Sequence, residues 1–235
     1  SEDATSATVR QAARGDPRLL LIEGTAPPTG WAGKAWACTR AAGEAHGALL
    51  LFIDADVRID ADAVAAVVAE RAAAELDLLS VFGTWELVSF WERALVPTVG
   101  WLIRGAVDLD RVNDPVHLDA FANGQFILVE REAYERVGGH GAVRDRILDD
   151  VGLAEAFKRR GRRIGIRAAP WTFRVRLYRS LSEIVAGYGK NLYEGMGRRP
   201  AVGLGAVLFI FVGTLFPFIA LAGALFARLV VGWGL

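Results

Sequence analysis

LLLFIDADVRI, residues 49–59, is the stretch that decides the fold class of this chain. Residues 48–53 are apolar at every position, which is typical of a strand covered on both faces by helices. The strand runs directly into Asp54-Ala55-Asp56, and ligands of open α/β sheets gather beyond the carboxyl ends of strands. Two carboxylates in that position predict a shared divalent cation, because Mg²⁺ commonly binds one or two carboxylates together with substrate phosphates.

The same acidic pair has two other interpretations. Asp54 and Asp56 would also serve as a capping pair for the next helix, a role for which Asp60 and Asp62 compete. A phosphohydrolase would use Asp54 as a nucleophile and Asp56 as its acid. That class normally carries the motif on its first strand, with a lysine ahead of a downstream acidic pair, whereas Lys158 follows the pair in this chain.

Short apolar runs alternate with amphipathic segments along most of the chain, which is the rhythm of an α/β domain. The predicted strands cover residues 18–24, 48–53, 76–82, 124–129 and 163–167. The predicted helices cover residues 32–45, 60–75, 131–137, 149–160 and 181–193, and a polar loop covers 108–119.

The segment 85–103 combines several aromatic residues with few charged ones. Tryptophan is enriched where proteins meet the membrane interface, so the segment predicts either an interfacial helix or a helix of the core. Both interpretations stay open from the sequence.

A second acidic pair, Asp149-Asp150, opens an amphipathic helix. One interpretation is structural, since carboxylates in a first helical turn are stabilised by the helix dipole. The functional interpretation makes one of them a general base that deprotonates a hydroxyl nucleophile. The three histidines show no metal-ligand spacing and are interpreted as ordinary surface or core residues: His46, His117 and His140.

Two further segments contain candidate substrate contacts. Gly33 and Lys34 follow a glycine turn before a helix, where backbone N–H groups and a lysine approach a phosphate or ribose. This is not a Walker A loop, because the glycine spacing differs and no Ser or Thr follows the lysine. Asn123 and Gln125 begin a predicted strand, and their amides are candidates for hydrogen bonds to a sugar or acceptor, with a turn as the alternative.

Acidic and basic side chains are separated along the chain, although the formal net charge is zero. Residues 1–120 carry 18 acidic and 10 basic side chains, while residues 121–235 carry 9 and 17. The basic half suits an anionic membrane surface or a phosphorylated ligand. Nucleic acid is not an expected partner, because the basic residues are not interleaved with an aromatic platform. Cys38 is the only cysteine, which excludes an internal disulfide and is typical of a reducing compartment.

Residues 201–227 contain no charged side chain. About 20 apolar residues span a bilayer core, so this run predicts a transmembrane segment, crossing once or bending at Pro217. Arg198 and Arg199 stand at its edge, and positive flanks favour the cytoplasmic side. We therefore expect a protein of the inner (plasma) membrane with a cytoplasmic catalytic domain.

Taken together, these motifs resemble the family 2 glycosyltransferases, specifically the branch associated with hopanoid biosynthesis. The matching stretches are PPTGWAGKAWAC (27–38), LLLFIDADVRI (49–59), ANGQFILVEREAYERVGGH (122–140), LDDVGLAEAFKRRG (148–161) and LYRSLSEIVAGYGKNLYEG (177–195).

The resemblance implies a GT-A-type, Rossmann-like fold with a mostly parallel sheet flanked by helices. Asp54 and Asp56 would bind Mg²⁺ or Mn²⁺ on the diphosphate of a nucleotide-sugar donor. Asp150 stands where such enzymes place the catalytic base, and Asp149 replaces the usual Glu before it. One base without an evident nucleophile implies inversion at the anomeric carbon by direct displacement.

Two departures from the family pattern refine this expectation. Ser1-Glu2-Asp3 resembles the tail of an Asp-Asp-x-Ser-x-Asp pattern, so we expect residues 1–178 to be a catalytic domain lacking its first strands. The Gln-x-x-Arg-Trp motif of processive relatives is replaced by residues 178–191, which favours single transfer to a lipid-like acceptor. Residues 179–200 would then form a juxtamembrane helix, and residues 201–235 the transmembrane segment. The non-enzymatic alternative is a membrane-tethered domain that binds a partner through residues 85–101.

Overall fold

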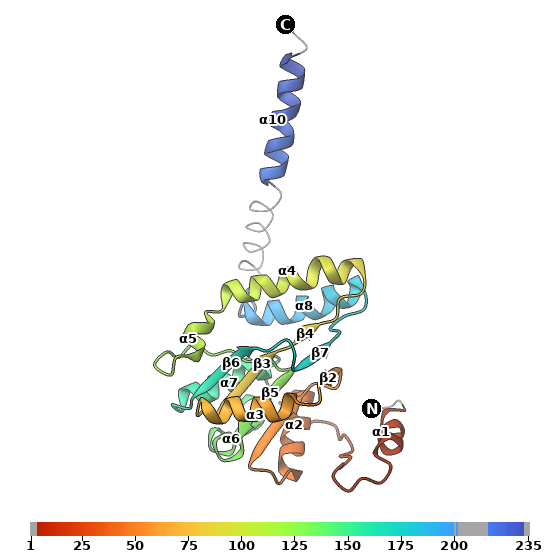
Figure 1. Cartoon of the computed structure of the whole chain (residues 1–235), viewed down its shortest axis with the longest axis vertical. Helices are drawn as coiled ribbons and strands as arrows, with labels where there is room; N and C mark the ends of the chain where they lie inside the picture. The colour runs from red at the N-terminus through yellow and green to blue at the C-terminus, as the bar shows by residue number, and fades with distance from the viewer. Residues whose placement is uncertain (1–3, 200, 202–215, 233–235) are drawn as a thin grey trace. The chain divides into compact units, whose positions relative to one another are not determined.

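The computed structural model of the chain describes residues 4–199, 201 and 216–232. The chain divides into two compact units, Ser1–Ile184 and Val185–Leu235. The first unit contains the helices α1 (Thr5–Ala13), α2 (Gly33–Glu44), α3 (Ala63–Ala73), α4 (Phe90–Ala106), α5 (Leu109–Asn113), α6 (Arg131–Val137) and α7 (Asp149–Arg159). Its strands are β1 (Leu49–Ile53), β2 (Val57–Ile59), β3 (Leu78–Phe82), β4 (Thr84–Trp85), β5 (Phe126–Glu130), β6 (Ile164–Ala168) and β7 (Phe173–Val175) (Figure 1).

The main sheet of the first unit has the strand order β1-β5-β3-β6. Strand β5 pairs antiparallel with both β1 and β3, while β3 and β6 pair in parallel. The prediction of a mostly parallel sheet is therefore wrong. The main sheet is mixed, because β5 runs antiparallel to both of its neighbours. Ile53 at the end of β1 pairs with Phe126 at the start of β5, so the chain enters β5 from the edge where β1 ends.

Helices cover both faces of this sheet, as the alternation of side chains along a strand requires. In β5, Ile127 and Val129 belong to a core cluster shared with α6 and α7, whereas Phe126 and Leu128 belong to a second cluster shared with α3. The first unit is thus an α/β/α arrangement, with its apolar core divided between two faces (Figure 1).

Strand β1 is less buried than its composition predicts. Leu50 is 5% exposed, whereas Ile53, the last residue of the strand before the turn to β2, is 45% exposed. Both faces of the strand are nevertheless covered, as predicted: Leu50 and Phe52 pack in the core cluster shared with α6 and α7, and Leu49 and Leu51 pack against the cluster shared with α3.

The predicted strand at residues 18–24 is also wrong, since the structure shows no strand there. Leu19 and Leu20 are 45% and 64% exposed. An apolar run becomes a strand only when it finds a hydrogen-bonding neighbour, and no described strand pairs with this segment.

Several short elements were not predicted. Strands β2, β4 and β7 form a second sheet of order β2-β7-β4, and helix α5 interrupts the predicted polar loop. The strands of this second sheet have only two or three residues each, and α5 is little more than one helical turn, so neither gives enough positions for a periodic pattern. The other predicted helices and strands of the first unit are confirmed, with ends displaced by a few residues.

In the second unit the structure describes the end of helix α8 (Leu181–Gly195) and helix α10 (Phe216–Gly232). Much of the predicted transmembrane segment, residues 202–215 and 233–235, lies outside the described residues. Within the described part of the chain, no helix has both the length and the apolar character needed to cross a membrane.

Candidate functional site

The first acidic pair lies in a tight turn that joins β1 to β2. The N–H of Val57 donates to the carbonyl oxygen of Asp54 over 3.2 Å, and the N–H of Asp54 donates to the carbonyl oxygen of Gln125 over 3.4 Å. Asp54 is half-buried and Asp56 is exposed. The turn therefore presents two carboxylates just beyond the carboxyl end of β1, as the sequence predicts.

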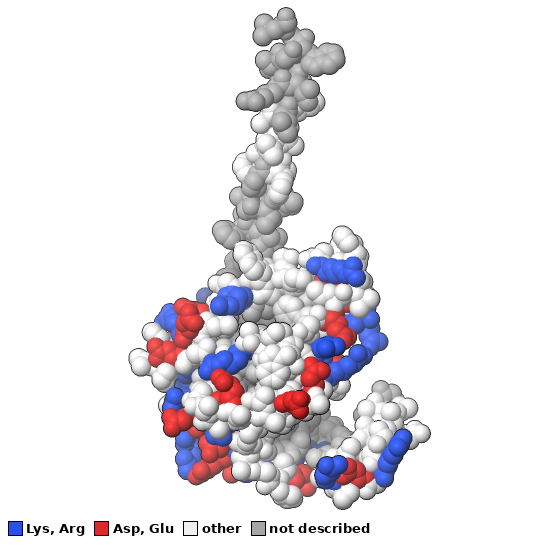
Figure 2. All heavy atoms as spheres, in the orientation of Figure 1, with Lys and Arg blue, Asp and Glu red and all other residues white. Residues whose placement is uncertain are grey.

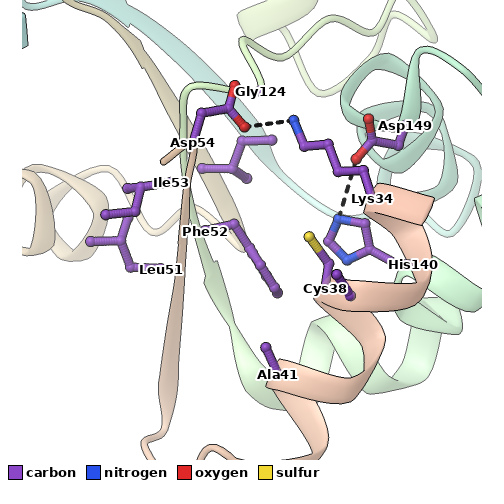
Figure 3. A pocket seen from close by; sticks show the side chains of 12 residues that line it. Lys34, Cys38, Ala41, Leu51, Phe52, Ile53, Asp54, Gly124, His140 and Asp149 are labelled. Atoms are coloured by element: carbon purple, nitrogen blue, oxygen red, sulfur yellow. Dashed lines mark ion pairs between the residues drawn. The ribbon is translucent and has the colours of Figure 1, made fainter. Parts of the chain in front are cut away.

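Lys34 extends from the first turn of α2 to this pair. Its Nζ atom lies 2.8 Å from Oδ1 of Asp54, and Figure 3 shows the side chain between Asp54 and Asp149. Burial acts to lower the lysine pKa, but the negative charges of Asp149, Asp54 and Asp150 outweigh it, so the pKa is raised. The ammonium group is therefore held in its charged form among carboxylates. Gly33 begins α2 and is exposed, with open space where a Cβ would lie.

Asp150 is held by backbone donors at the start of α7. The N–H of Gly124 donates to Oδ2 over 2.8 Å, and the N–H of Val151 donates to Oδ1 over 2.8 Å. A Cβ at Gly124 would lie 2.8 Å from Oδ2 of Asp150 and 3.2 Å from Nζ of Lys34. Glycine is thus required at 124 for these groups to approach one another. Burial raises the pKa of Asp150 despite the hydrogen bonds and Lys34, which favour the charged form.

Asp149 is buried beside an aromatic and imidazole cluster. It is 5% exposed, and its Oδ2 lies 3.8 Å from Nε2 of His140, which is 2% exposed. The hydroxyl of Tyr134 lies 2.8 Å from the ring Nδ1 of His140. The same hydroxyl accepts a hydrogen bond from the backbone N–H of His140 over 3.1 Å. Burial raises the pKa of Asp149. The positive charge of Lys34 acts to lower it, and the negative charges of Asp150 and Asp54 add to the rise. Burial also lowers the pKa of His140 to about 4, so the imidazole is neutral at physiological pH.

The amide of Asn123 is used inside the protein. Its Nδ2 donates to the carbonyl oxygen of Val81 over 2.9 Å and to Oε1 of Gln125 over 3.2 Å. The buried hydroxyl of Ser80 accepts from the Asn123 N–H over 2.8 Å and donates to the Asn123 carbonyl oxygen. These bonds fix the turn that carries Gly124, which is the turn role left open by the sequence. Contact of Asn123 or Gln125 with a substrate stays a prediction.

These groups line one side of a cavity of about 280 Å³ between α2 and β1 (Figure 3). Lys34, Asp54, Gly124, His140 and Asp149 supply its polar lining. The remaining lining is mostly apolar and comprises Ala37, Cys38, Ala41, Leu51, Phe52, Ile53 and Ile127. Burial raises the pKa of Cys38 to about 11, so its thiol stays protonated.

The structure brings together residues that the sequence placed on separate elements, but it also adds one that the sequence did not single out. Lys34, Asp54, Asp149 and Asp150 meet around Gly124. His140 was interpreted as an ordinary residue, yet it packs edge-on against Phe52, with ring centroids 4.7 Å apart, and faces Asp149. His140 follows Gly138 and Gly139, outside any periodic segment and without the spacing of a metal ligand, so the sequence did not mark it as a site residue.

The first acidic pair fits a hard divalent cation that also binds a phosphorylated ligand. Asp54 and Asp56 offer carboxylate oxygens from one turn, and Mg²⁺ typically takes one or two carboxylates with phosphate oxygens. Among the described residues, no group of three or more His, Cys, Asp or Glu side chains is arranged to hold a metal by itself.

Glycosyltransferases are among the solved structures that resemble this chain. A mannosyltransferase from Pyrobaculum calidifontis, in complex with GDP-mannose and Mn²⁺, superposes with a TM-score of 0.51 at 22% identity, covering 77% of this chain and 46% of that chain. The fold is of the GT-A type. A glucosyl-3-phosphoglycerate synthase from Mycobacterium tuberculosis, in complex with Mn²⁺ and UDP-glucose, gives a TM-score of 0.44 at 18% identity, covering 78% and 60% of the two chains.

The chain thus spans about half the length of the mannosyltransferase, and the likeness establishes the GT-A fold alone. No family model matches the sequence, and no curated protein matches it in a sequence search.

Proposed function

We propose that the protein is a metal-dependent, inverting glycosyltransferase that moves a sugar from a nucleotide-activated donor to a lipid-like acceptor. The observation that carries the proposal is the meeting of Lys34, Asp54 and Asp150 around Gly124 at the carboxyl end of β1. A GT-A fold with this arrangement provides a cation site, a positive charge for phosphate and a base within one region. The GDP-mannose and Mn²⁺ bound by the mannosyltransferase of similar fold favour the same class of donor.

The donor side of the site consists of Asp54, Asp56 and Lys34. The two carboxylates would hold Mg²⁺ or Mn²⁺ against the donor diphosphate, with Lys34 and Gly33 close to the phosphates or ribose. When bound, the cation supplies Lewis-acid neutralisation of the diphosphate leaving group. Lys34, which pairs with Asp54 in the structure, would exchange part of that contact for phosphate oxygens.

The acceptor side consists of Asp150, with Asp149 behind it. Asp150 takes the proton from the acceptor hydroxyl as the hydroxyl oxygen bonds to the anomeric carbon and the bond from that carbon to the diphosphate breaks. A single displacement inverts the anomeric configuration. The N–H donors of Gly124 and Val151 orient the carboxylate, and a raised pKa makes it a stronger base than an exposed aspartate.

Membrane attachment and a lipid-like acceptor are supported by the C-terminal sequence. Residues 201–227 are uncharged and follow Arg198 and Arg199, which favours a catalytic domain on the cytoplasmic face of the plasma membrane. The ordered motif set supports assignment to family 2 and its hopanoid-associated branch.

Transfer by the full-length protein tests this proposal. Detergent-solubilised protein, Mn²⁺ and a panel of nucleotide sugars are incubated with a bacterial lipid extract, and glycosylated lipid is measured by mass spectrometry. We expect a lipid product whose formation falls at least 1,000-fold in Asp150→Asn, since the base is lost. Asp145→Asn is the matched control, because Asp145 is an exposed carboxylate just before α7. Equal product from Asp150→Asn and wild type would contradict the assignment of the base.

A further inference from the structure

Helix α4 presents an apolar aromatic stripe to the outside of the first unit. Phe90 is 72% exposed, Trp91 46% and Trp101 77%. Phe90, Ala94, Pro97 and Trp101 are spaced by three or four residues and share one face of the helix, and all four are exposed. Large apolar side chains that gather on one exposed helical face mark an interaction surface.

This orientation is fixed by the opposite face of α4. Glu92 is 1% exposed and accepts hydrogen bonds from Arg176 over 2.9 and 3.1 Å. The same carboxylate accepts from the N–H groups of Val88 and Ser89, closing a capping box at the start of the helix. Arg176 holds the pKa of Glu92 well below its usual range, so the buried carboxylate is charged and paired with the half-buried guanidinium. The helix cannot rotate to bury its aromatic stripe without breaking this pair.

Close packing in the middle of the helix adds a second constraint. A Cβ at Gly100 would lie 2.4 Å from the Trp85 ring, so the helix backbone rests directly on that ring. Val96 is 1% exposed on the same inner side. The inner face of α4 is thus closely packed, and the aromatic side chains on its outer face are not part of the core.

The charge on the outer face is of one sign. Arg93 and Arg104 are exposed on α4 and donate to the backbone carbonyl oxygens of Leu87 and Val107, over 3.3 and 3.4 Å. The only carboxylate of α4 is Glu92, which is buried. Figure 2 shows uncharged atoms along α4, with basic atoms near its two ends.

We propose that α4 is an interfacial helix that lies in the plane of an anionic phospholipid surface. Phe90, Trp91 and Trp101 enter the boundary between headgroups and acyl chains, and Arg93 and Arg104 contact lipid phosphates. Aromatic side chains at that depth with flanking arginines are the composition expected of such helices.

Charge favours a lipid surface over a second copy of the chain. Two copies pairing through this stripe would bring Arg93 and Arg104 of one helix against the arginines of the other, and α4 itself offers no exposed carboxylate to pair with them. The proposal stands on α4 alone and does not depend on glycosyl transfer. It also differs from anchoring by residues 201–235, which would hold the protein to a bilayer without immersing α4.

A site-specific probe separates these cases. In the full-length protein carrying Cys38→Ala, Trp101→Cys is labelled with an environment-sensitive fluorophore and reconstituted into vesicles of phosphatidylcholine and phosphatidylglycerol (3:1). Trp171→Cys is the matched control, because Trp171 is 54% exposed in the loop between β6 and β7. We expect a blue-shifted probe at position 101 that is quenched by spin-labelled lipid and shielded at least threefold from aqueous iodide, relative to position 171.

Charge reversal tests the electrostatic part of the proposal. Arg93→Glu combined with Arg104→Glu should return the probe at position 101 to iodide quenching within about twofold of the control, while circular dichroism shows retained folding. Equal aqueous quenching at positions 101 and 171 in vesicle-bound wild-type protein would overturn the proposal. A blue shift that depends on protein concentration and persists without lipid would assign the stripe to a second copy and overturn it equally.

Discussion

The Nζ atom of Lys34 lies 2.8 Å from Oδ1 of Asp54, which ties the first turn of α2 to the carboxyl end of β1. The lysine also lies in the electrostatic field of Asp149 and Asp150 at the start of α7. The ammonium group of Lys34 therefore stabilises negative charge on two separate segments, the turn after β1 and the start of α7. Removing it should affect both donor binding and the titration of the base.

Lys34→Met tests this coupling. We expect donor affinity to fall by about 10- to 100-fold, the usual effect of losing a hydrogen bond to a charged group. The pKa of Asp150 should rise, because Lys34 favours its ionised form, so the acid limb of the pH–activity profile should move to higher pH. Arg159→Met removes an exposed cation of α7 and should leave both unchanged. A pH profile identical to that of wild type would show that Lys34 does not act on the base.

Gly124→Ala should displace Asp150 without unfolding the protein. The new Cβ would lie 2.8 Å from a carboxylate oxygen, so the side chain must move and lose its hydrogen bond from the backbone. We expect kcat to fall about 100-fold or more, because small misplacements of a base are costly, with little change in donor affinity.

Gly43→Ala is the matched control for this substitution. Gly43 lies within α2 with open space at its Cβ position, so alanine there should stabilise the protein by roughly 0.5–1 kcal/mol and leave kcat unchanged. Equal kcat for Gly124→Ala and wild type would mean that the bond to Asp150 has no catalytic role.

His140 should make stability depend on pH. Its pKa is lowered from 6.5 to about 4 in the folded protein, by burial and by Lys34. Between these values the unfolded chain binds a proton that the folded chain does not, so the free energy of unfolding decreases as pH falls from 6.5 to 4. The loss amounts to about 3 kcal/mol for this residue alone.

Urea unfolding at pH 4.5 and 7.5 measures this loss. The reference is His140→Phe combined with Tyr134→Phe, which keeps the ring packing on Phe52 and removes the tyrosine hydroxyl that would lose its imidazole partner. Between pH 7.5 and 4.5, the free energy of unfolding of the double variant should decrease by about 2 kcal/mol less than that of wild type. A difference within 0.5 kcal/mol would contradict a buried neutral imidazole.

The sequence predicted the parts of the fold that depend on local pattern. The uninterrupted apolar run before Asp54 corresponds to β1, and the amphipathic pattern after Asp150 corresponds to α7. Both signals lie in the segment that forms the element. The direction of β5 depends on where the chain re-enters the sheet, and no local pattern encodes that. The failure of residues 18–24 to form a strand has the same origin, since pairing requires a neighbour elsewhere in the chain.

The site was predicted in part for a similar reason. Acidic residues at a strand end and at a helix start are visible as motifs, and the structure brings Asp54 and Asp150 to the same lysine. His140 and Ser80 had no such signal. Each acts through a tertiary contact, His140 facing Asp149 and Ser80 fixing the turn before Gly124.

The central claim is that Asp54 and Asp56 hold a divalent cation against the diphosphate of a nucleotide sugar. The most direct test is a thermal-shift titration of the full-length protein in detergent with UDP-, GDP- and dTDP-sugars, with and without Mn²⁺. Wild type is compared with Asp54→Asn/Asp56→Asn and with the control Asp60→Asn/Asp62→Asn, which removes two carboxylates between β2 and α3. We expect a Mn²⁺-dependent rise of about 5 °C or more in the melting temperature at saturating ligand for one nucleotide class, kept in the control and lost in the site variant. A rise that is independent of Mn²⁺, or that the Asp54→Asn/Asp56→Asn variant retains, would contradict it.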